Sequence, residues 1–223
     1  RPIKELAASN SRFVQQSRAS VQSSIARQLG FATDKRRSTP AEAGAAELMA
    51  DLYRHYAAPL TDQILFDWHA MLMNGRRDLE VIGGYRTHAE AMQIISGPIH
   101  APHIHFEAPP SQNVPSKMAQ FIEWFNKTAP NGAEPLPAIE RAAVAHLWFE
   151  TIHPFEDGNG RIGRAIAEKA LAQSLEAPTL TALAATINAH KKAYYIELHR
   201  ASETNSIDAW MGWFGNVVLE AQS

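Results

Sequence analysis

The sequence predicts a mainly α-helical domain, a helical bundle interrupted by one small β-hairpin. Apolar residues recur at helical spacing over most of the chain, and Pro and Gly separate these stretches. Helical spacing disappears only between residues 82 and 109, where glycines and a proline punctuate short strand-like runs. The length of 223 residues fits one globular domain, or one domain with a short appendage.

The first half of the chain divides at clear helix signals. Residues 3–29 form a polar, Ser-rich stretch with an apolar stripe, which Gly30 ends. Ser38-Thr39-Pro40 predicts a cap and a first-turn proline for a helix that stops near Pro59. Thr61 predicts the cap of the next helix, which ends at Asn74-Gly75.

The second half begins with the predicted hairpin and returns to helices. Met92–Ile95 and His103–Phe106 predict the two strands of a hairpin or flap. Pro154 bars continuation of the strongly apolar helix before it, because proline lacks an N–H and restricts the preceding residue. The expected helices cover a face from Met118 to Phe125, residues Ala138–Thr151, a helix opening near Arg161, Ile187–Ala201 and Ile207–Leu219.

Composition excludes several classes of function. Lys and Arg (21) nearly balance Asp and Glu (23), and a nucleic-acid surface requires a basic excess, so no nucleic-acid partner is expected. The absence of cysteine excludes disulfides, thiol nucleophiles and Cys-built zinc sites, and it is compatible with the cytoplasmic location that we expect. No apolar run approaches the roughly 18–20 residues that span a bilayer, and no secretory leader is evident, so no membrane partner is expected.

The most informative stretch is residues 153–164, His-Pro-Phe-Glu-Asp-Gly-Asn-Gly-Arg-Ile-Gly-Arg. Gly158 and Gly160 remove side chains where a backbone must approach another group closely. Successive N–H groups ahead of a helix N-terminus bind anions, and the helix dipole adds to the attraction. Arg161 and Arg164 are three residues apart, so both project from one face near that positive end. The pattern therefore indicates a polyphosphate site.

Two further residues of this stretch indicate chemistry at the phosphates. A carboxylate beside phosphates, here Asp157, most naturally holds Mg²⁺. His153 stands at the end of the preceding helix, where it can accept a proton from an attacking hydroxyl.

The stretch matches the Fic motif, His-x-Phe-x-Asp/Glu-Gly-Asn-Gly-Arg-x-x-Arg, at every specified position. Gly83-Gly84-Tyr85-Arg86 resembles the element before the flap in that family. His146-Leu147-Trp148-Phe149 resembles its helix leading into the motif, and Lys192-Ala193-Tyr194-Tyr195 its helix beside the adenine pocket. The chain thus resembles Fic-domain protein adenylyltransferases of the bacterial single-chain type. Residues 39–223 would be the catalytic domain, and residues 1–38 an N-terminal helical segment that is a remnant of, or substitute for, an inhibitory region.

The resemblance implies transfer of AMP from Mg-ATP to a Ser, Thr or Tyr hydroxyl of a target protein, with release of pyrophosphate. His153 would be the general base and Asp157 the Mg²⁺ ligand, while Phe155 would anchor the loop. The phosphates would be held by Gly158, Asn159, Gly160, Arg161 and Arg164, and the adenine would lie beside Tyr194 and Tyr195.

An exposed strand edge at Gln93, Ile94 and Ile95 could pair with the extended main chain of the target and bring its hydroxyl to His153. The target could be the chain itself. The competing interpretation is that the hairpin only covers an edge of the core.

One departure from the family concerns regulation. The inhibitory Ser/Thr-x-x-x-Glu-Gly/Asn helix of many members has no match here, and Arg12 stands where its Glu is expected. A degenerate inhibitor, one on a missing N-terminal segment, or one supplied by a partner remain open. We expect Arg164 to be unblocked and removal of AMP to be weak.

Alternative interpretations also remain. The donor could be UTP or another phosphate-linked group, or the chain could be a non-catalytic nucleotide-binding module. His100, His103 and His105, with Glu107 nearby, are a weaker candidate metal site. Arg76-Arg77 reads as a solvated basic cluster.

Overall fold

The computed structural model describes residues 39–90, 92–96, 103–179, 183–204 and 206–222. The N-terminal segment 1–38, with the inhibitory region expected there, lies outside the described residues. The described part is mainly helical, as predicted. Its α-helices are α3 (Pro40–Arg54), α4 (Asp62–Leu72), α5 (Val114–Lys127), α6 (Ala138–Ile152), α7 (Asn159–Leu175), α8 (Leu183–Ala189), α9 (Lys191–Thr204) and α10 (Asp208–Gln222), with a short 3₁₀ turn, η1 (Ser111–Asn113), before α5.

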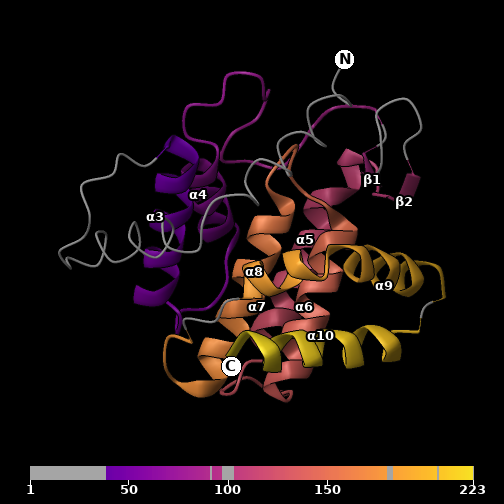
Figure 1. Cartoon of the computed structure of the whole chain (residues 1–223). Coiled ribbons are helices and arrows are strands. Elements are labelled where there is room, and N and C mark those ends of the chain that lie inside the picture. The colour runs from indigo at the N-terminus through magenta and orange to yellow at the C-terminus, as the bar shows by residue number, and fades with distance from the viewer. Residues whose placement is uncertain (1–38, 91, 97–102, 180–182, 205, 223) are drawn as a thin grey trace.

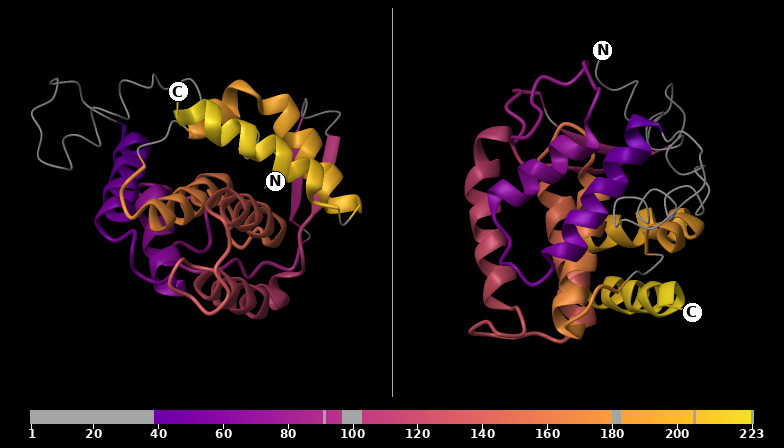
Figure 2. Two further views of the ribbon diagram at one scale, coloured as in Figure 1. Left: turned by 90° about the horizontal axis from the view of Figure 1, so that it is seen from below. Right: turned by 90° about the vertical axis from the view of Figure 1, so that its left-hand side faces the viewer.

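The antiparallel neighbours α6 and α7 form the centre of the domain. Helices α3 and α4 lie on one side of this pair and α8 to α10 on the other, while α5 packs along α6 (Figures 1 and 2). The indole of Trp210 in α10 donates a hydrogen bond to the Ala143 carbonyl oxygen of α6 (2.9 Å). No described helix is long and apolar enough to cross a membrane.

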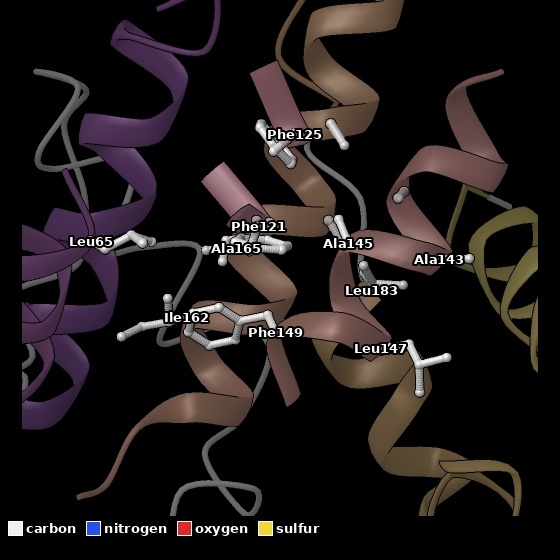
Figure 3. Packing of buried hydrophobic residues seen from close by; sticks show 14 of the residues in the cluster. Leu65, Phe121, Phe125, Ala143, Ala145, Leu147, Phe149, Ile162, Ala165 and Leu183 are labelled. Carbon is white, nitrogen blue, oxygen red and sulfur yellow. The ribbon is translucent and has the colours of Figure 1, made fainter. Parts of the chain in front are cut away.

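The core forms where apolar faces of these helices meet. Figure 3 shows fully buried side chains from α4 (Leu65), α5 (Phe121), α6 (Phe149) and α7 (Ile162) gathered in one cluster. The aromatic rings of Phe121 and Phe149 lie 6.0 Å apart, within the range of favourable aromatic pairs. This core fixes α6 and α7 against each other and thereby fixes the loop between them.

The predicted start signals act as expected. The Thr39 hydroxyl accepts a hydrogen bond from the Glu42 N–H and the Glu42 carboxylate accepts one from the Thr39 N–H, which is a capping box at α3. Thr61 caps α4 in the same way through the Ile64 N–H. One prediction was wrong: the helix expected from Ile187 to Ala201 is two helices, α8 and α9, with a break at His190. His190 pairs there with Glu220 of α10 (2.9 Å), a contact between elements that local spacing does not reveal.

Two short strands, β1 (Gln93–Ser96) and β2 (His103–Glu107), pair in an antiparallel arrangement. In the chain they follow the segment with Gly83 and Gly84 and precede η1. Gln93 is opposite Glu107 and Ile94 opposite Phe106, and the register shifts between Ile94 and Ile95. The sheet contains no other strand from the described part of the chain. β2 lies against α9.

Candidate functional site

The loop between α6 and α7 brings the predicted site residues together. His153 ends α6 in a left-handed conformation (φ 49°), and its N–H still bonds to the Phe149 carbonyl oxygen (3.0 Å). Gly158 precedes α7 with φ 85°, a region that favours glycine. No side chain caps the N-terminus of α7. That positive end is therefore open to an anion.

Two motif residues fix the shape of the loop. The Asn159 side chain accepts a hydrogen bond from the Phe155 N–H (2.9 Å) and donates one to the Phe155 carbonyl oxygen (2.8 Å). The Phe155 ring is fully buried and stacks on His69 of α4, with ring centroids 4.2 Å apart. The anchoring role expected for Phe155 fits this position, and Asn159 acts on the loop backbone itself.

Arg86 holds the same loop in place through hydrogen bonds, a role that the sequence did not reveal. Its backbone N–H bonds to the Pro154 carbonyl oxygen (2.9 Å), and its Nε donates to the His153 carbonyl oxygen (2.8 Å). Its two Nη atoms reach Ser111 (2.8 Å) and the Pro109 carbonyl oxygen (2.6 Å), which follow β2. The loop and the base of the hairpin are therefore held by one buried guanidinium.

His153 is in the right protonation state for a base. Its side chain is largely buried, and burial lowers the pKa of the imidazole to about 4, against the opposing effect of the Glu150 backbone carbonyl. The ring is consequently neutral near pH 7 and can accept a proton. Its Nδ1 has no hydrogen-bond partner, and the nearest acidic atom is Glu150 Oε2 at 3.8 Å.

Glu150, one turn before His153 in α6, is a site residue that sequence reasoning missed. It is 3% exposed, and its Oε1 makes no hydrogen bond. Burial raises the pKa of this carboxyl group to about 7, and the Arg164 charge acts in the opposite direction. Its only sequence signal is an acidic residue in the largely apolar C-terminal half of α6.

Asp157 carries a concentrated set of charge contacts. Its Oδ2 accepts a hydrogen bond from Arg76 (2.6 Å), and its Oδ1 accepts one from the Gly158 N–H (2.5 Å) and lies 3.5 Å from Arg161. Burial raises its pKa, but Arg161 and Arg76 outweigh this effect and hold the pKa below its ordinary value. Arg76, expected to be solvated, instead bridges Asp157 and Asp78.

This carboxylate suits magnesium only as an ion that arrives with phosphates. The described residues contain no group of three or more acidic or histidine side chains able to hold a metal by themselves. Mg²⁺ is usually bound by one or two carboxylates together with substrate phosphates, and one ionised carboxylate next to an uncapped helix N-terminus meets that requirement. Of the histidines weighed as a separate metal site, His100 lies outside the described residues, and only the backbone of His103 and His105 is described.

The glycines of α7 keep space beside the loop. A Cβ atom on Gly160 would lie 3.3 Å from Arg164 Nη1, and one on Gly163 would lie 2.7 Å from Glu150 Oε1. The first turn of α7 thus admits no further side chain between the two arginines and α6. Arg161 and Arg164 are both partly exposed.

The two tyrosines expected near the adenine differ in their surroundings. Tyr194 is buried, and its hydroxyl lies 3.2 Å from His146 Nε2. Its ring packs 6.0 Å from that of Trp210. Tyr195 is partly exposed, with Lys191 over its ring at 5.9 Å. Of the two, Tyr195 is the one with a surface available to a ligand.

Comparisons with known proteins agree with this geometry. The model of the Fic/DOC family matches residues 59–171, which include the hairpin, α6, the loop and most of α7. A probable protein adenylyltransferase from Aquifex aeolicus is 30% identical over 69 residues, 31% of this chain and 20% of that protein. Protein adenylyltransferase fic-1 from Caenorhabditis briggsae is 31% identical over 86 residues, 39% of this chain and 15% of that protein. Each match spans a fifth or less of the relative's length.

Solved structures share the fold over nearly the whole chain. A Fic family protein from Desulfovibrio desulfuricans G20 superposes with a TM-score of 0.69 at 22% identity, covering 99% of this chain and 63% of that one. A Fic-domain signaling protein from Bacteroides thetaiotaomicron superposes with a TM-score of 0.67 at 16% identity, covering 100% of this chain and 94% of that one. At these identities the likeness concerns the fold alone.

Proposed function

Because the chain belongs to the Fic/DOC family, we propose that it is a protein adenylyltransferase that moves AMP from ATP to a Ser, Thr or Tyr hydroxyl of a target protein. Relatives named protein adenylyltransferase support this at the level of the family. The observation that carries the proposal is a neutral, buried histidine next to an uncapped helix N-terminus with two arginines.

The residues divide the work of transfer. Arg161, Arg164 and the backbone at Gly158–Gly160 bind the polyphosphate and hold the α-phosphorus opposite the attacking hydroxyl. His153 Nε2 takes the hydroxyl proton as the new oxygen–phosphorus bond forms. The bond from the α-phosphorus to the bridging oxygen breaks, and pyrophosphate leaves. Most of the rate enhancement in such chemistry comes from positioning and charge stabilisation.

Mg²⁺ held by Asp157 and the phosphates would supply further charge neutralisation. In the described structure Asp157 Oδ2 instead accepts a hydrogen bond from Arg76. Arg76 would have to release that oxygen before it could serve as a metal ligand.

The test uses ATP labelled at the α-phosphate beside ATP labelled at the γ-phosphate, with the wild-type chain, a cell extract as the source of targets, and His153→Ala. We expect covalent protein label from the α-position alone, lost in the variant while ATP binding is retained. Label from the γ-position would contradict the proposal. Label from UTP but not ATP would replace the donor, and no transfer from either would leave a binding module.

Target docking through the hairpin is part of the proposal. β1 has β2 on one side and no other strand from the described chain on the other, so Gln93, Ile94 and Ile95 offer a sheet edge. Proline removes the backbone N–H of the residue that it replaces. Successive N–H groups of a strand point to opposite sides, so one of two neighbouring residues in β1 directs its N–H away from β2. One of Ile94→Pro and Ile95→Pro should therefore slow target labelling without weakening ATP binding. Unchanged labelling by both variants would show that the hairpin only covers the core.

Regulation is the final part. Among the described residues Arg164 has no acidic partner within 4.0 Å, which supports a site that is open to the γ-phosphate. Transfer should begin without an activator, and removal of AMP from a modified target should be weak. An activity that appears only after a partner is removed, or strong AMP removal, would contradict this.

A further inference from the structure

Glu150 lies at the active site with no part in the chemistry described above. It stands three residues before His153 on α6, and its side chain is 4% exposed. A buried carboxylate is costly unless it is paired or serves a purpose. No hydrogen bond from the described residues satisfies its Oε1. The fold therefore leaves one oxygen of this buried carboxyl group without a hydrogen bond.

The carboxylate of Glu150 lies close to the His153 ring. Glu150 Oε2 and His153 Nδ1 are 3.8 Å apart, too far for a hydrogen bond and close enough for a strong charge interaction in a buried place. Hydrogen bonds of a catalytic base are often long before the substrate binds. The Glu150 backbone also acts on the same imidazole, whose pKa it raises against the larger effect of burial.

The other described groups around Glu150 form no hydrogen bond with its Oε1. On α6, His146 is buried with its Nδ1 unpartnered. On α7, Arg164 acts on Glu150 only through its charge, and Gly163 leaves the space that Oε1 occupies. On α9, Tyr194 and Tyr195 also feel its charge, which raises their pKa values in addition to burial. Beyond Glu150, Arg86 and Asp157 act on His153 with opposite signs.

We propose that Glu150 is the positioning residue of the general base: its ionised carboxylate lies on the Nδ1 side of His153 and stabilises the imidazolium formed when Nε2 takes the target hydroxyl proton. This inference rests on the proposed function. The arrangement follows the same logic as a carboxylate behind the histidine of a hydrolase triad.

The proposal has a consequence for pH dependence. The carboxylate supports the base only when ionised, and burial places its pKa near 7. Transfer should therefore rise with pH through about 7, since His153 itself is already neutral there. Without the carboxylate this step should be absent.

The first experiment compares wild type with Glu150→Gln, which keeps the shape and removes the charge. We expect kcat to fall about tenfold to a hundredfold, the KM for ATP to change less than about threefold, and the step near pH 7 to vanish. Glu150→Asp should keep the step. The matched control is Glu168→Gln, at an equally buried carboxylate in the C-terminal half of α7. Glu168 accepts hydrogen bonds from Tyr53 and Thr179. This variant should leave kcat and the pH profile unchanged.

Two results would overturn the inference. If Glu150→Gln changes the KM for ATP and not kcat, the carboxylate serves as a counter-ion for Arg164. If kcat falls equally in Glu150→Gln and Glu168→Gln with the pH step intact, the effect is structural.

A second measurement separates this inference from the proposed function. The ring resonances of His153 in ¹⁵N NMR of the free protein should show an inflection near pH 7 that Glu150→Gln removes and Glu168→Gln retains. Failure of the wild type to transfer AMP would refute the proposed function but leave this coupling in place. A His153 titration identical in wild type and Glu150→Gln would overturn the inference even if transfer is observed.

Discussion

The two halves of α7 each have buried charges beside them, and they are treated in opposite ways. Next to the C-terminal half, every buried charge reaches hydrogen-bond partners. Next to the N-terminal half, the buried Glu150, His153 and His146 retain atoms without partners. Glu150, Arg141 and Lys169 are all at most 3% exposed, so the difference between these side chains does not come from burial.

In the C-terminal half the charges stabilise the fold. Arg141 donates to the Phe125 carbonyl oxygen (2.7 Å) and to Gln173 (2.8 Å), and it lies 4.0 Å above the Phe125 ring. Lys169 donates to the carbonyl oxygens of His55 and Tyr56, which directly follow α3 (3.0 and 2.9 Å). A buried charge with all its partners ties elements together.

In the N-terminal half the unsatisfied atoms of Glu150 and His146 lie beside Gly163 of α7, and that of His153 lies at the start of the loop. Unpaired buried polar groups usually cost about 1–3 kcal/mol each, so a fold keeps them where they are used. The comparison teaches that unsatisfied buried atoms beside α7 gather in the half next to the candidate site, where Arg86 and Asp157 are nevertheless hydrogen-bonded.

The largest expected effect on stability is in the C-terminal half. Arg141→Met should lower the free energy of unfolding by about 2–6 kcal/mol, because it removes the donor to two buried acceptors, the Phe125 carbonyl oxygen and Gln173, at about 1–3 kcal/mol each. Urea denaturation checks this. A loss below about 1 kcal/mol would show that the contacts of Arg141 are incidental.

Glu150→Gln should stabilise the fold at high pH. The pKa of Glu150 is about 7 in the folded chain, above the 4.5 of an exposed Glu. The folded chain therefore keeps a proton that the unfolded chain loses, and stability falls as pH rises through this window. The variant should be more stable than wild type at pH 8, by at most about 3 kcal/mol, and equal to it near pH 4. Denaturation at both pH values decides; the same difference at both would mean that ionisation of Glu150 is not the cause.

A smaller effect distinguishes two helical glycines. Gly163→Ala places a Cβ 2.7 Å from Glu150 Oε1 and 3.2 Å from His146 Nδ1, so it should cost about 1–3 kcal/mol and displace the carboxylate from His153. Gly212→Ala in α10 meets nothing within 4 Å and should stabilise by up to about 1 kcal/mol. Thermal denaturation of the two variants should shift in opposite directions. A shift in the same direction would contradict the close packing at Gly163.

Local signals of the sequence predicted much of this domain. Thr39 with Glu42, Thr61 and Pro154 mark helix ends through contacts within four residues, so they are readable without a structure. Residues 153–164 predicted the loop for the same reason. The side-chain roles of Arg86 and Arg76 depend on partners about 70 to 80 residues away, which no local pattern indicates. Glu150 was missed because its neighbours make the helix look like plain core.

The central claim is that the incompletely hydrogen-bonded buried groups near the loop serve transfer, while the hydrogen-bonded charges at the far end of α7 serve stability. The most direct measurement is the rate of AMP transfer from α-labelled ATP by wild type, His153→Ala and Arg141→Met, at a temperature where the last remains folded. We predict a loss of about a thousandfold or more for His153→Ala and a rate within about threefold of wild type for Arg141→Met. Retained transfer by His153→Ala, or its loss in folded Arg141→Met, would contradict the account.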